Sequence, residues 1–260
     1  MSSFHPPRLY AIIDASCFLS FRAENPQTYA DSQRGNPCSP PTIATSATAP
    51  RSAPTPALVT TAIPCHPERS EGPAVSQLLH YAQELVKAGV TLIQYRNKTA
   101  TAREILSHAR ELRRILPPDV TFFLNDRADL ALAANADGVH VGQDDLSPEG
   151  ARLVVGNTKL IGVSTHNRAQ LEIASQAPVD YIAIGPIFST RSKANPDPVV
   201  GLDGLRKIRK LTTKPLIAIG GITRENCRSV IEAGADSVAV IADLLADPKR
   251  HAEQFLQLLG

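Results

Sequence analysis

Three side chains with complementary chemistry stand at alternate positions in the segment QYRNK: Gln94, Arg96 and Lys98. In an extended chain, residues at positions i, i+2 and i+4 project from the same face. One amide and two cations on one face suit a polyanion, because the arginine guanidinium can donate two parallel hydrogen bonds to phosphate oxygens. The alternative is a solvated strand end that pairs with nearby acids. The combination of three such residues favours the anion site.

Carboxylates occur in two further segments, LND and GVHVGQDD, which contain Asp126 and the pair Asp144 and Asp145. We expect both segments to end neighbouring strands, so that Asp126 and one of the pair approach a single point. Two carboxylates beside a phosphate site suit Mg²⁺, which takes one or two carboxylates plus substrate phosphate oxygens. The spacing leaves open which of the pair takes part, since Asp144, Asp145 or Ser147 could instead cap a helix that begins at Pro148.

Two histidines invite catalytic interpretations that the sequence does not support. The segment GVSTH places Ser164 two residues before His166, but it has no nucleophile elbow and no obvious third member of a triad. We therefore expect the Ser164 hydroxyl to donate to a phosphate, and His166 or Asn167 to cap the next helix. His140 alternates with valines, which predicts an inward-facing, hydrogen-bonded residue rather than a metal ligand.

The segment GPIFSTRSK, residues 185–193, forms a long predicted loop after a strand. It holds two hydroxyls two positions apart, Thr190 and Ser192, and then Lys193. Loops that follow strands usually carry function when a rigid scaffold positions them. We also expect the Pro-Ile-Phe start of this loop to pack against a flat heteroaromatic ring.

The elements that must position these residues are short apolar runs alternating with amphipathic helical stretches. This alternation indicates a parallel sheet covered by helices. Eight such units in roughly 200 residues predict a single α/β domain, a (β/α)₈ TIM barrel, with its chemistry at the carboxyl ends of the strands. The alternative, an open doubly wound sheet, would show a glycine fingerprint after the first strand, where the chain instead has Asp14-Ala15-Ser16. We expect strands at 9–14, 91–95, 121–125, 138–141, 160–164, 181–185, 216–220 and 237–241, and helices most clearly at 76–88, 102–116, 168–176, 201–211, 225–233 and 248–259.

Two segments at the ends of the seventh and eighth strands predict a phosphate site made by backbone groups. They contain Gly220-Gly221 and the pair Ile241-Ala242. Consecutive glycines let the backbone approach a phosphate closely, and these two loops commonly bind phosphate in a TIM barrel. The sequence therefore predicts two anion sites. A charged, metal-assisted site suits a diphosphate, and a neutral cup of backbone N–H groups suits a monophosphate.

Residues 22–73 differ in composition from the rest of the chain. Ten of the 21 prolines lie between residues 24 and 73, among many Ser, Thr and Ala residues. Such a segment cannot bury enough apolar surface to offset its conformational entropy. We interpret it as a long, disordered low-complexity insertion in the first βα loop of one barrel domain spanning residues 1–260. The sequence does not decide whether it acts as a lid or is inert.

Composition excludes several classes of function. The formal charge of +2 gives no basic field for nucleic acid, and 43% hydrophobic residues suffice for a large core. No apolar run approaches the roughly 20 residues that a membrane span needs. The start of the chain has no secretory pattern, and its four cysteines stand singly, which indicates a reduced, cytoplasmic protein. The sequence does not indicate an oligomeric state.

In this order and spacing, the segments above resemble the thiamine-phosphate synthase family, whose members are (β/α)₈ barrels. The segments that carry the resemblance are QYRNK, LND, GVHVGQDDL, GVSTH, GPIFSTRSK, IGGI and AGADSVAVI. The resemblance covers residues 8–14 and then the chain from residue 75 or so to its end. It implies a transferase of thiamine biosynthesis that joins 4-amino-2-methyl-5-pyrimidinylmethyl diphosphate to 4-methyl-5-(2-phosphoethyl)thiazole, giving thiamine phosphate and diphosphate. It also implies Mg²⁺ as the cofactor.

The resemblance further implies roles for individual residues. Asp126 and Asp145 would ligate Mg²⁺, which selects Asp145 from the pair that the spacing left open. The residues implied to act in catalysis are Arg96, Lys98, Ser164 and Lys193. The pyrimidine diphosphate would be held by Gln94, Arg96, Lys98, Asn125, Ser164 and Lys193, and the thiazole phosphate by Thr190, Ser192, Gly221, Ile241 and Ala242.

The chain departs from the family pattern at two positions besides the insertion. Ser192 stands where Thr is usual, and Ala242 where a small hydroxyl residue is common. Three other functions compete with the synthase: a thiazole tautomerase-like barrel, a non-catalytic thiazole-phosphate-binding barrel, and a sugar-phosphate isomerase or epimerase. The last would need a general acid–base pair, for which Asp14 is the one spare carboxylate at a predicted strand end.

Overall fold

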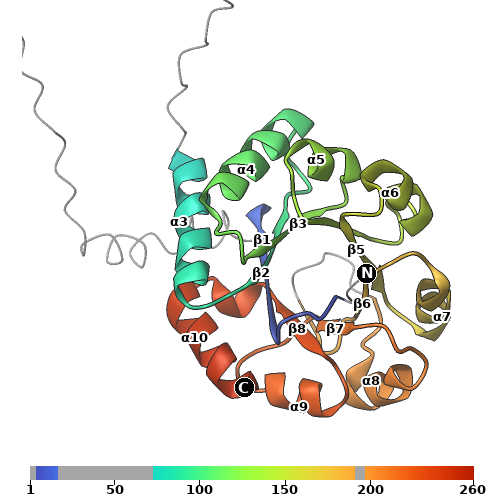
Figure 1. Ribbon diagram of the computed structural model, residues 1–260. Coiled ribbons are helices and arrows are strands. Elements are labelled where there is room, and N and C mark those ends of the chain that lie inside the picture. Colours follow the sequence, from blue (N-terminus) through green and yellow to red (C-terminus); the bar gives the residue numbers. More distant parts are fainter. Residues whose placement is uncertain (1–3, 17–72, 191–196) are drawn as a thin grey trace, which may run out of the picture.

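The computed structural model of the chain describes residues 4–16, 73–190 and 197–260. Eight parallel strands form a closed barrel in which each strand pairs with the next and β8 pairs with β1 (Figure 1). The predicted TIM barrel is therefore confirmed. The strands are β1 (Leu9–Asp14), β2 (Leu92–Arg96), β3 (Thr121–Asn125), β4 (Gly138–Val141), β5 (Leu160–Thr165), β6 (Tyr181–Ile184), β7 (Leu216–Ile219) and β8 (Ser237–Val240).

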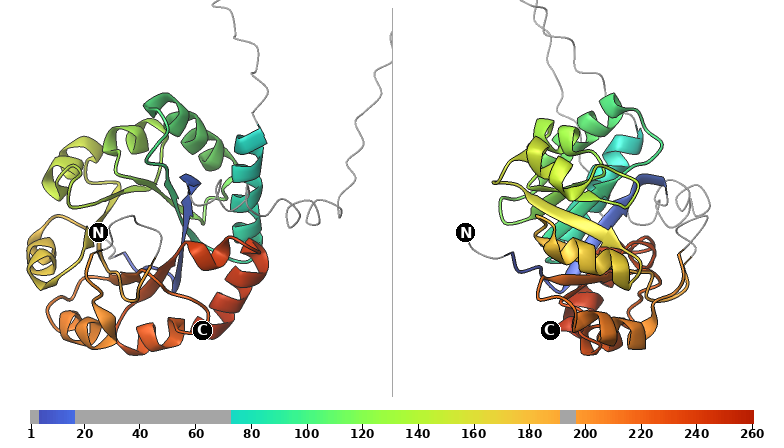
Figure 2. Two further views of the ribbon diagram at one scale, coloured as in Figure 1. Left: turned by 180° about the vertical axis from the view of Figure 1, so that it is seen from behind. Right: turned by 90° about the vertical axis from the view of Figure 1, so that its right-hand side faces the viewer.

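Helices surround this barrel on the outside, and one follows each strand (Figures 1 and 2). The predicted helices are all present, with ends that shift by at most three residues. The helices are α3 (Pro73–Lys87), α4 (Ala102–Ile115), α5 (Ala128–Ala133), α6 (Pro148–Val155), α7 (Arg168–Gln176), α8 (Gly201–Arg209), α9 (Cys227–Glu232) and α10 (Pro248–Leu259), with a short 3₁₀ helix η1 (Ala242–Leu244) after β8.

Side-chain caps explain where two of these helices begin. Ser147 accepts a hydrogen bond from Gly150 N at 3.1 Å and caps α6, whose first residue is Pro148. Asn167 caps α7 by accepting from Gln170 N at 3.0 Å. Of the capping candidates that the sequence left open, the structure therefore selects Ser147 and Asn167. Asp145 and His166 do not cap these helices and can make other contacts at the carboxyl ends of β4 and β5.

The interior of the barrel is filled by aromatic rings. Tyr10, Phe123 and Tyr181 are buried, with ring centroids 5.4 Å apart for Phe123–Tyr181 and 6.0 Å apart for Tyr10–Tyr181. Gly138 and Gly162 make room for them, since a Cβ on either glycine would collide with the ring of Phe123 or Tyr181, respectively. These rings fill the end of the barrel nearer the amino ends of the strands. The inward side chains nearer the carboxyl ends of the strands line an open cavity.

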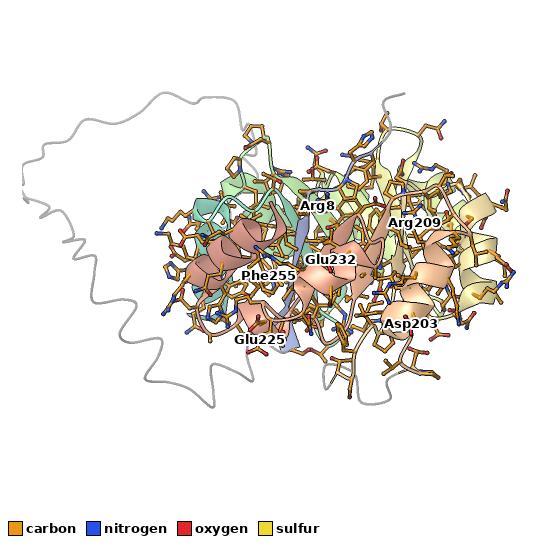
Figure 3. The ribbon with its side chains drawn as sticks, turned by 90° about the horizontal axis from the view of Figure 1, so that it is seen from below. Arg8, Asp203, Arg209, Glu225, Glu232 and Phe255 are labelled. Atoms are coloured by element: carbon orange, nitrogen blue, oxygen red, sulfur yellow. The ribbon has the colours of Figure 1, made fainter. Side chains whose placement is uncertain are left out.

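A second core lies between the barrel and its helices. Phe255 of α10 is fully buried against it, whereas Asp203 of α8 and Glu232 of α9 are exposed (Figure 3). Each helix thus buries one apolar face, as its amphipathic sequence predicts. None of the helices among the described residues is both long and apolar enough to cross a membrane.

The predicted insertion at 22–73 lies outside the described residues except for its last member. Pro73 is the first residue of α3, so the predicted end of the insertion was wrong by one residue. Proline suits the first turn of a helix, because the N–H group that it lacks has no intrahelical partner there.

Candidate active site

A cavity of about 220 Å³ lies at the carboxyl ends of the strands. Lys98, Asp126 and Asp145 are not part of its lining but adjoin it, and Ser192 and Lys193 lie outside the described residues. The structure therefore brings together most of the residues that the sequence singled out. Those that line the cavity are Gln94, Arg96, Asn125, Ser164, Thr190, Gly221, Ile241 and Ala242.

Arg96 provides a cation in the cavity and is held by a buried carboxylate. Its Nη1 atom forms an ion pair with Asp14, which lies opposite it in the register of β1 and β2. Asp14 is 1% exposed and also accepts hydrogen bonds from the backbone N and the Oγ of Ser16, at 3.0 and 2.5 Å. This carboxylate restricts the guanidinium to one orientation, which prepares it to bind an anion.

The predicted carboxylate pair forms at the ends of β3 and β4. The carboxyl groups of Asp126 and Asp145 are hydrogen-bonded neighbours, and burial together with this contact raises the pKa of Asp126 to about 6. Lys98 Nζ lies 3.0 Å from Asp126 Oδ2, and Gly142 N donates to Asp145 Oδ2 at 2.8 Å. Asp144 is exposed. The geometry therefore pairs Asp145 with Asp126, as the family resemblance implied.

The backbone of Asp126 is itself unusual. Its φ of 62° lies in the left-handed region, which non-glycine residues seldom adopt, although Asp and Asn tolerate it best. Such strain is concentrated at functional sites, where the surrounding structure holds it in place. Here the Asp126 N–H donates to the carbonyl of His140 on β4 at 2.7 Å, which ties the turn to the neighbouring strand.

His140 confirms the expectation of an inward-facing, hydrogen-bonded residue. It is 7% exposed, with Nδ1 2.7 Å from the hydroxyl of Tyr181 and Nε2 2.8 Å from Oγ of Ser164. Burial lowers the pKa of His140 to about 4, so the imidazole is neutral near pH 7. Ser164 thus meets the cavity with a neutral histidine behind it.

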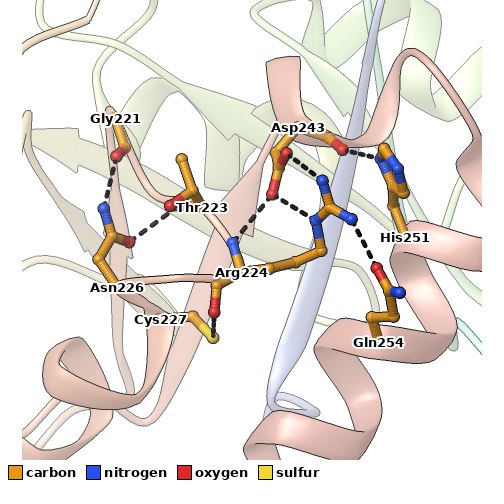
Figure 4. A network of polar contacts seen from close by, with 8 residues as sticks. All are labelled: Gly221, Thr223, Arg224, Asn226, Cys227, Asp243, His251 and Gln254. Carbon is orange, nitrogen blue, oxygen red and sulfur yellow. Dashed lines mark hydrogen bonds and ion pairs between the residues drawn. The ribbon is translucent and has the colours of Figure 1, made fainter.

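The loop after β7 lines the cavity with a cup of backbone groups. Gly221 has a φ of 65°, and a Cβ there would lie 2.5 Å from Ser189 O, so a larger residue would not fit. Asn226 holds this loop: its Oδ1 accepts from Thr223 N at 2.8 Å and its Nδ2 donates to Gly221 O at 3.0 Å (Figure 4). The N–H groups of Gly221 and Ala242 donate to no other described residue, so both can donate hydrogen bonds to a ligand in the cavity.

A polar clamp joins this loop to the one after β8. Arg224 donates from its backbone N, Nε and Nη2 to the carboxylate of Asp243, at 2.9, 3.0 and 3.1 Å (Figure 4). Gln254 and His251 of α10 bind Arg224 Nη1 and the Asp243 carbonyl, respectively, each at 2.5 Å. The two loops that make the cup are therefore held together by a bidentate ion pair.

The loop after β6 corrects one expectation. Only Pro186 of its Pro-Ile-Phe start lines the cavity. Ile187 is fully buried in the second core, between the barrel and its helices, and Phe188 packs against that core. The expected packing of the Pro-Ile-Phe start against a heteroaromatic ring is therefore wrong for Ile187 and Phe188, whose side chains are directed toward the helices.

Several residues of the site were missed or given no role in the sequence. Asp14 was treated as a spare carboxylate, although its place at the end of β1, beside Arg96 at the end of β2, was a usable signal. Tyr10 and Tyr181 were not singled out, yet both stand at inward positions of apolar strands. His166 and Asp197 also line the cavity, with His166 Nδ1 2.6 Å from Gly185 O and 3.5 Å from Asp197 Oδ2.

Comparison with known proteins agrees with this geometry. A family model described as thiamine monophosphate synthase matches residues 65–244. Thiamine-phosphate synthase of Koribacter versatilis is 73% identical over 187 residues, which cover 72% of this chain and 89% of that protein. The corresponding protein of Methanosarcina barkeri is 38% identical over 190 residues, 72% of this chain and 86% of its own.

A solved structure, thiamine phosphate pyrophosphorylase from Pyrococcus furiosus, has the same fold. It superposes with a TM-score of 0.64 at 34% identity and covers 70% of this chain and 88% of its own. The matched family region contains the carboxylate pair, the backbone cup and all residues that line the cavity except Ile12 and Asp14. The chain therefore belongs to the thiamine-phosphate synthase family, a family of transferases.

Proposed function

We propose that this protein condenses 4-amino-2-methyl-5-pyrimidinylmethyl diphosphate with 4-methyl-5-(2-phosphoethyl)thiazole to give thiamine phosphate and diphosphate. The observation that carries the proposal is that one cavity has two chemically different ends. One end has a fixed guanidinium beside a carboxylate pair, and the other is a neutral cup of backbone N–H groups. A diphosphate suits the first end and a monophosphate the second.

The pyrimidine diphosphate would bind at the charged end. Arg96, oriented by Asp14, would fork onto phosphate oxygens, and Asn125 and Ser164 would donate further hydrogen bonds. Lys98 borders the same end. We assign Gln94 to this substrate as well, and Lys193 from its sequence position alone, since it lies outside the described residues.

The carboxylate pair fits Mg²⁺. Its two hard oxygen donors adjoin the proposed phosphate site, and burial, followed by the contact with Asp145, raises the pKa of Asp126. Among the described residues no group of three or more potential ligands forms, so Asp126 and Asp145 would leave the remaining coordination positions to water and phosphate oxygens. Bound there, Mg²⁺ would offset the negative charge of the diphosphate.

The thiazole phosphate would bind in the cup. Gly221, Ile241 and Ala242 line it, and Thr190, on the loop after β6, lines the same cavity. Ser192, the other hydroxyl proposed here, lies outside the described residues. The contact that Ala242 would supply is its backbone N–H, so the absence of a hydroxyl at this position removes no backbone donor.

The arrangement suits a reaction in which the diphosphate leaves and the thiazole nitrogen then attacks the pyrimidinylmethyl cation. Such a reaction needs little acid–base catalysis and much stabilisation of charge on the leaving group. The cations and hydroxyl donors at the charged end provide this stabilisation, and the two ends of the cavity align the rings. Contacts that strengthen as charge gathers on the diphosphate would raise kcat rather than only improve binding.

The experiment is an assay of diphosphate release with both substrates, with each omitted in turn, and with and without Mg²⁺. We expect release only with both substrates and metal, and thiamine phosphate in equal amount. A folded protein that binds thiazole phosphate yet releases no diphosphate would refute the synthase. That result would favour a tautomerase-like or non-catalytic phosphate-binding barrel.

The cellular location of the protein and its partners are also proposals. We propose a cytoplasmic enzyme whose partners are its two small-molecule substrates. The supporting observations are the near-neutral charge, the isolated cysteines and the buried, free thiol of Cys227. Fractionation of the producing cells, with antibody detection of the chain, tests the location.

A further inference from the structure

A line of hydrogen bonds crosses the barrel beneath the cavity, and its three inner residues have no part in the reaction as proposed so far. It begins at Gln94 on β2, passes through Tyr10, Tyr181 and His140, and ends at Ser164 on β5. The successive donor–acceptor distances are 2.7, 3.0, 2.7 and 2.8 Å. The three inner residues are at most 7% exposed. Because buried polar groups are costly unless fully satisfied, such a line restricts where each proton lies.

The donor at the Gln94 end of the line decides the direction of every bond in it. The amide nitrogen of Gln94 only donates, so the hydroxyl of Tyr10 accepts from it and gives its own proton to Tyr181. Tyr181 then donates to Nδ1 of His140. A neutral imidazole carries one proton, which must therefore be on Nε2 and point at Ser164 Oγ. The proton of Ser164 is left for the cavity that this residue lines.

We infer that Tyr10, Tyr181 and His140 are positioning residues that direct the hydroxyl proton of Ser164 into the cavity. There the Ser164 hydroxyl donates a hydrogen bond to the leaving diphosphate. The identity of the acceptor rests on the proposed function, whereas the order of protons is a property of the free protein. A donor that is oriented before the substrate binds needs no reorganisation when charge develops. The reverse order would turn the Ser164 proton toward His140 and present only lone pairs to an anion.

The first test reads the proton position directly. In ¹⁵N-labelled protein without substrates, NMR of the His140 ring should show a protonated Nε2 and an unprotonated Nδ1, with the signals assigned by their loss in His140→Gln. Gln94→Glu replaces the donor at the start of the line by a carboxylate acceptor, so every bond should reverse and the proton should move to Nδ1. A wild-type ring protonated on Nδ1 overturns the inference, and so does an unchanged tautomer in folded Gln94→Glu. The wild-type spectrum alone decides the matter where Gln94→Glu does not fold.

The second test asks whether the line acts through Ser164. Tyr181→Phe should lower kcat by about tenfold, the effect of one lost or misdirected hydrogen bond to a developing charge, and leave the KM for thiazole phosphate unchanged. In a Ser164→Ala background the same substitution should have no further effect on kcat. An equal loss in both backgrounds would assign Tyr181 a merely structural role and refute the inference.

The chain offers a closely matched control for this substitution. Tyr95 is also fully buried, and its hydroxyl lies 2.7 Å from Nδ1 of another histidine, His108. This pair lies outside the barrel interior, between β2 and α4. Tyr95→Phe should therefore reduce the melting temperature about as much as Tyr181→Phe but leave kcat unchanged.

These tests separate the inference from the proposed function. A wild-type protein that makes no thiamine phosphate refutes the proposed function, yet its His140 tautomer can still be read. A wild-type protein that makes thiamine phosphate with His140 protonated on Nδ1 refutes the inference alone.

Discussion

The Nζ atom of Lys98 lies 3.0 Å from Oδ2 of Asp126, so a lysine cation borders the carboxylate pair that we assign to Mg²⁺. If Mg²⁺ binds as we propose, lysine and metal would compete for the same carboxylate before substrate binds. We predict that Lys98→Ala binds Mn²⁺, used as a paramagnetic probe, about threefold more tightly in the absence of substrates, since a half-exposed ion pair is worth under about 1 kcal/mol. The same variant should turn over more slowly, because Lys98 also borders the diphosphate site.

Electron paramagnetic resonance of free Mn²⁺ measures this affinity. Lys87→Ala is the control, since Lys87 pairs with Glu84 on α3, away from the carboxylate pair, and its loss should change nothing. Unchanged or weaker Mn²⁺ binding by Lys98→Ala would contradict the assigned metal site.

Asp14 should matter for both stability and binding. Asp14→Ala leaves the Arg96 guanidinium without the carboxylate that holds it, and breaking a largely buried pair of this kind costs about 3 kcal/mol of unfolding free energy. We also expect a raised KM for the pyrimidine diphosphate, with the KM for thiazole phosphate unchanged. Urea denaturation and steady-state kinetics measure the two effects. Asp203→Ala, which removes an exposed pair with Arg206, serves as the control and should change neither.

The depressed pKa of His140 predicts a specific dependence of stability on pH. The ring titrates near 6.5 in the unfolded chain and at about 4 in the folded one, so the unfolded state binds more protons between these values. The stabilising contribution is therefore complete above pH 6.5 and is lost as the pH falls through 4. His140→Gln cannot titrate and should lose less unfolding free energy than the wild type between pH 7 and pH 5. Urea titrations at both pH values measure these unfolding free energies. If the wild type and His140→Gln lose equal amounts between pH 7 and pH 5, His140 does not cause the pH dependence.

Two glycines with similar positive φ values allow the effect of backbone strain to be measured separately from that of steric crowding. Gly221 and Gly156 have φ values of 65° and 69°, but a Cβ at Gly156 meets no atom within 4 Å, whereas one at Gly221 meets Ser189 O at 2.5 Å. Gly156 has a ψ of −167°, a conformation essentially restricted to glycine, so Gly156→Ala should cost about 2 kcal/mol of stability from the backbone alone. Gly221→Ala should cost more and also weaken thiazole phosphate binding, as calorimetric titration would show. If Gly221→Ala and Gly156→Ala change thiazole phosphate binding equally, the phosphate binds elsewhere.

That residues 22–73 are an insertion within one barrel domain remains a proposal, and of the two roles left open, lid or inert segment, we now propose the inert one. The relative from Koribacter versatilis aligns with 187 residues of this chain yet covers 89% of its own length, which leaves little counterpart for such a segment. We predict that replacing residues 22–72 with a short Gly-Ser linker leaves kcat within about twofold and changes stability little, because loop length costs little entropy. A large fall in kcat, measured beside an intact Tm, would instead identify a lid.

Much of the fold could be predicted from the sequence because the signals are local. Apolar runs and amphipathic periods fixed the strands and helices, and eight repeats of strand and helix leave few arrangements other than a closed barrel. Alternation along β2 also placed Gln94 and Arg96 on one inward face. The helix starts were harder, since Asp145 and Ser147 are equally able to cap, and only the structure shows Ser147 in that role.

The relations between the site residues were decided by the tertiary structure. Asp14 and Arg96 are 82 residues apart, and Tyr10 and Tyr181 are 171 apart, yet strand register and barrel closure bring each pair into contact. The same closure places Asp145 rather than Asp144 against Asp126, and turns Ile187 away from the cavity. A linear sequence specifies which groups are present and which face of its own strand each one occupies. The distances across the barrel depend on how eight strands stagger as they close, and no single strand carries that information.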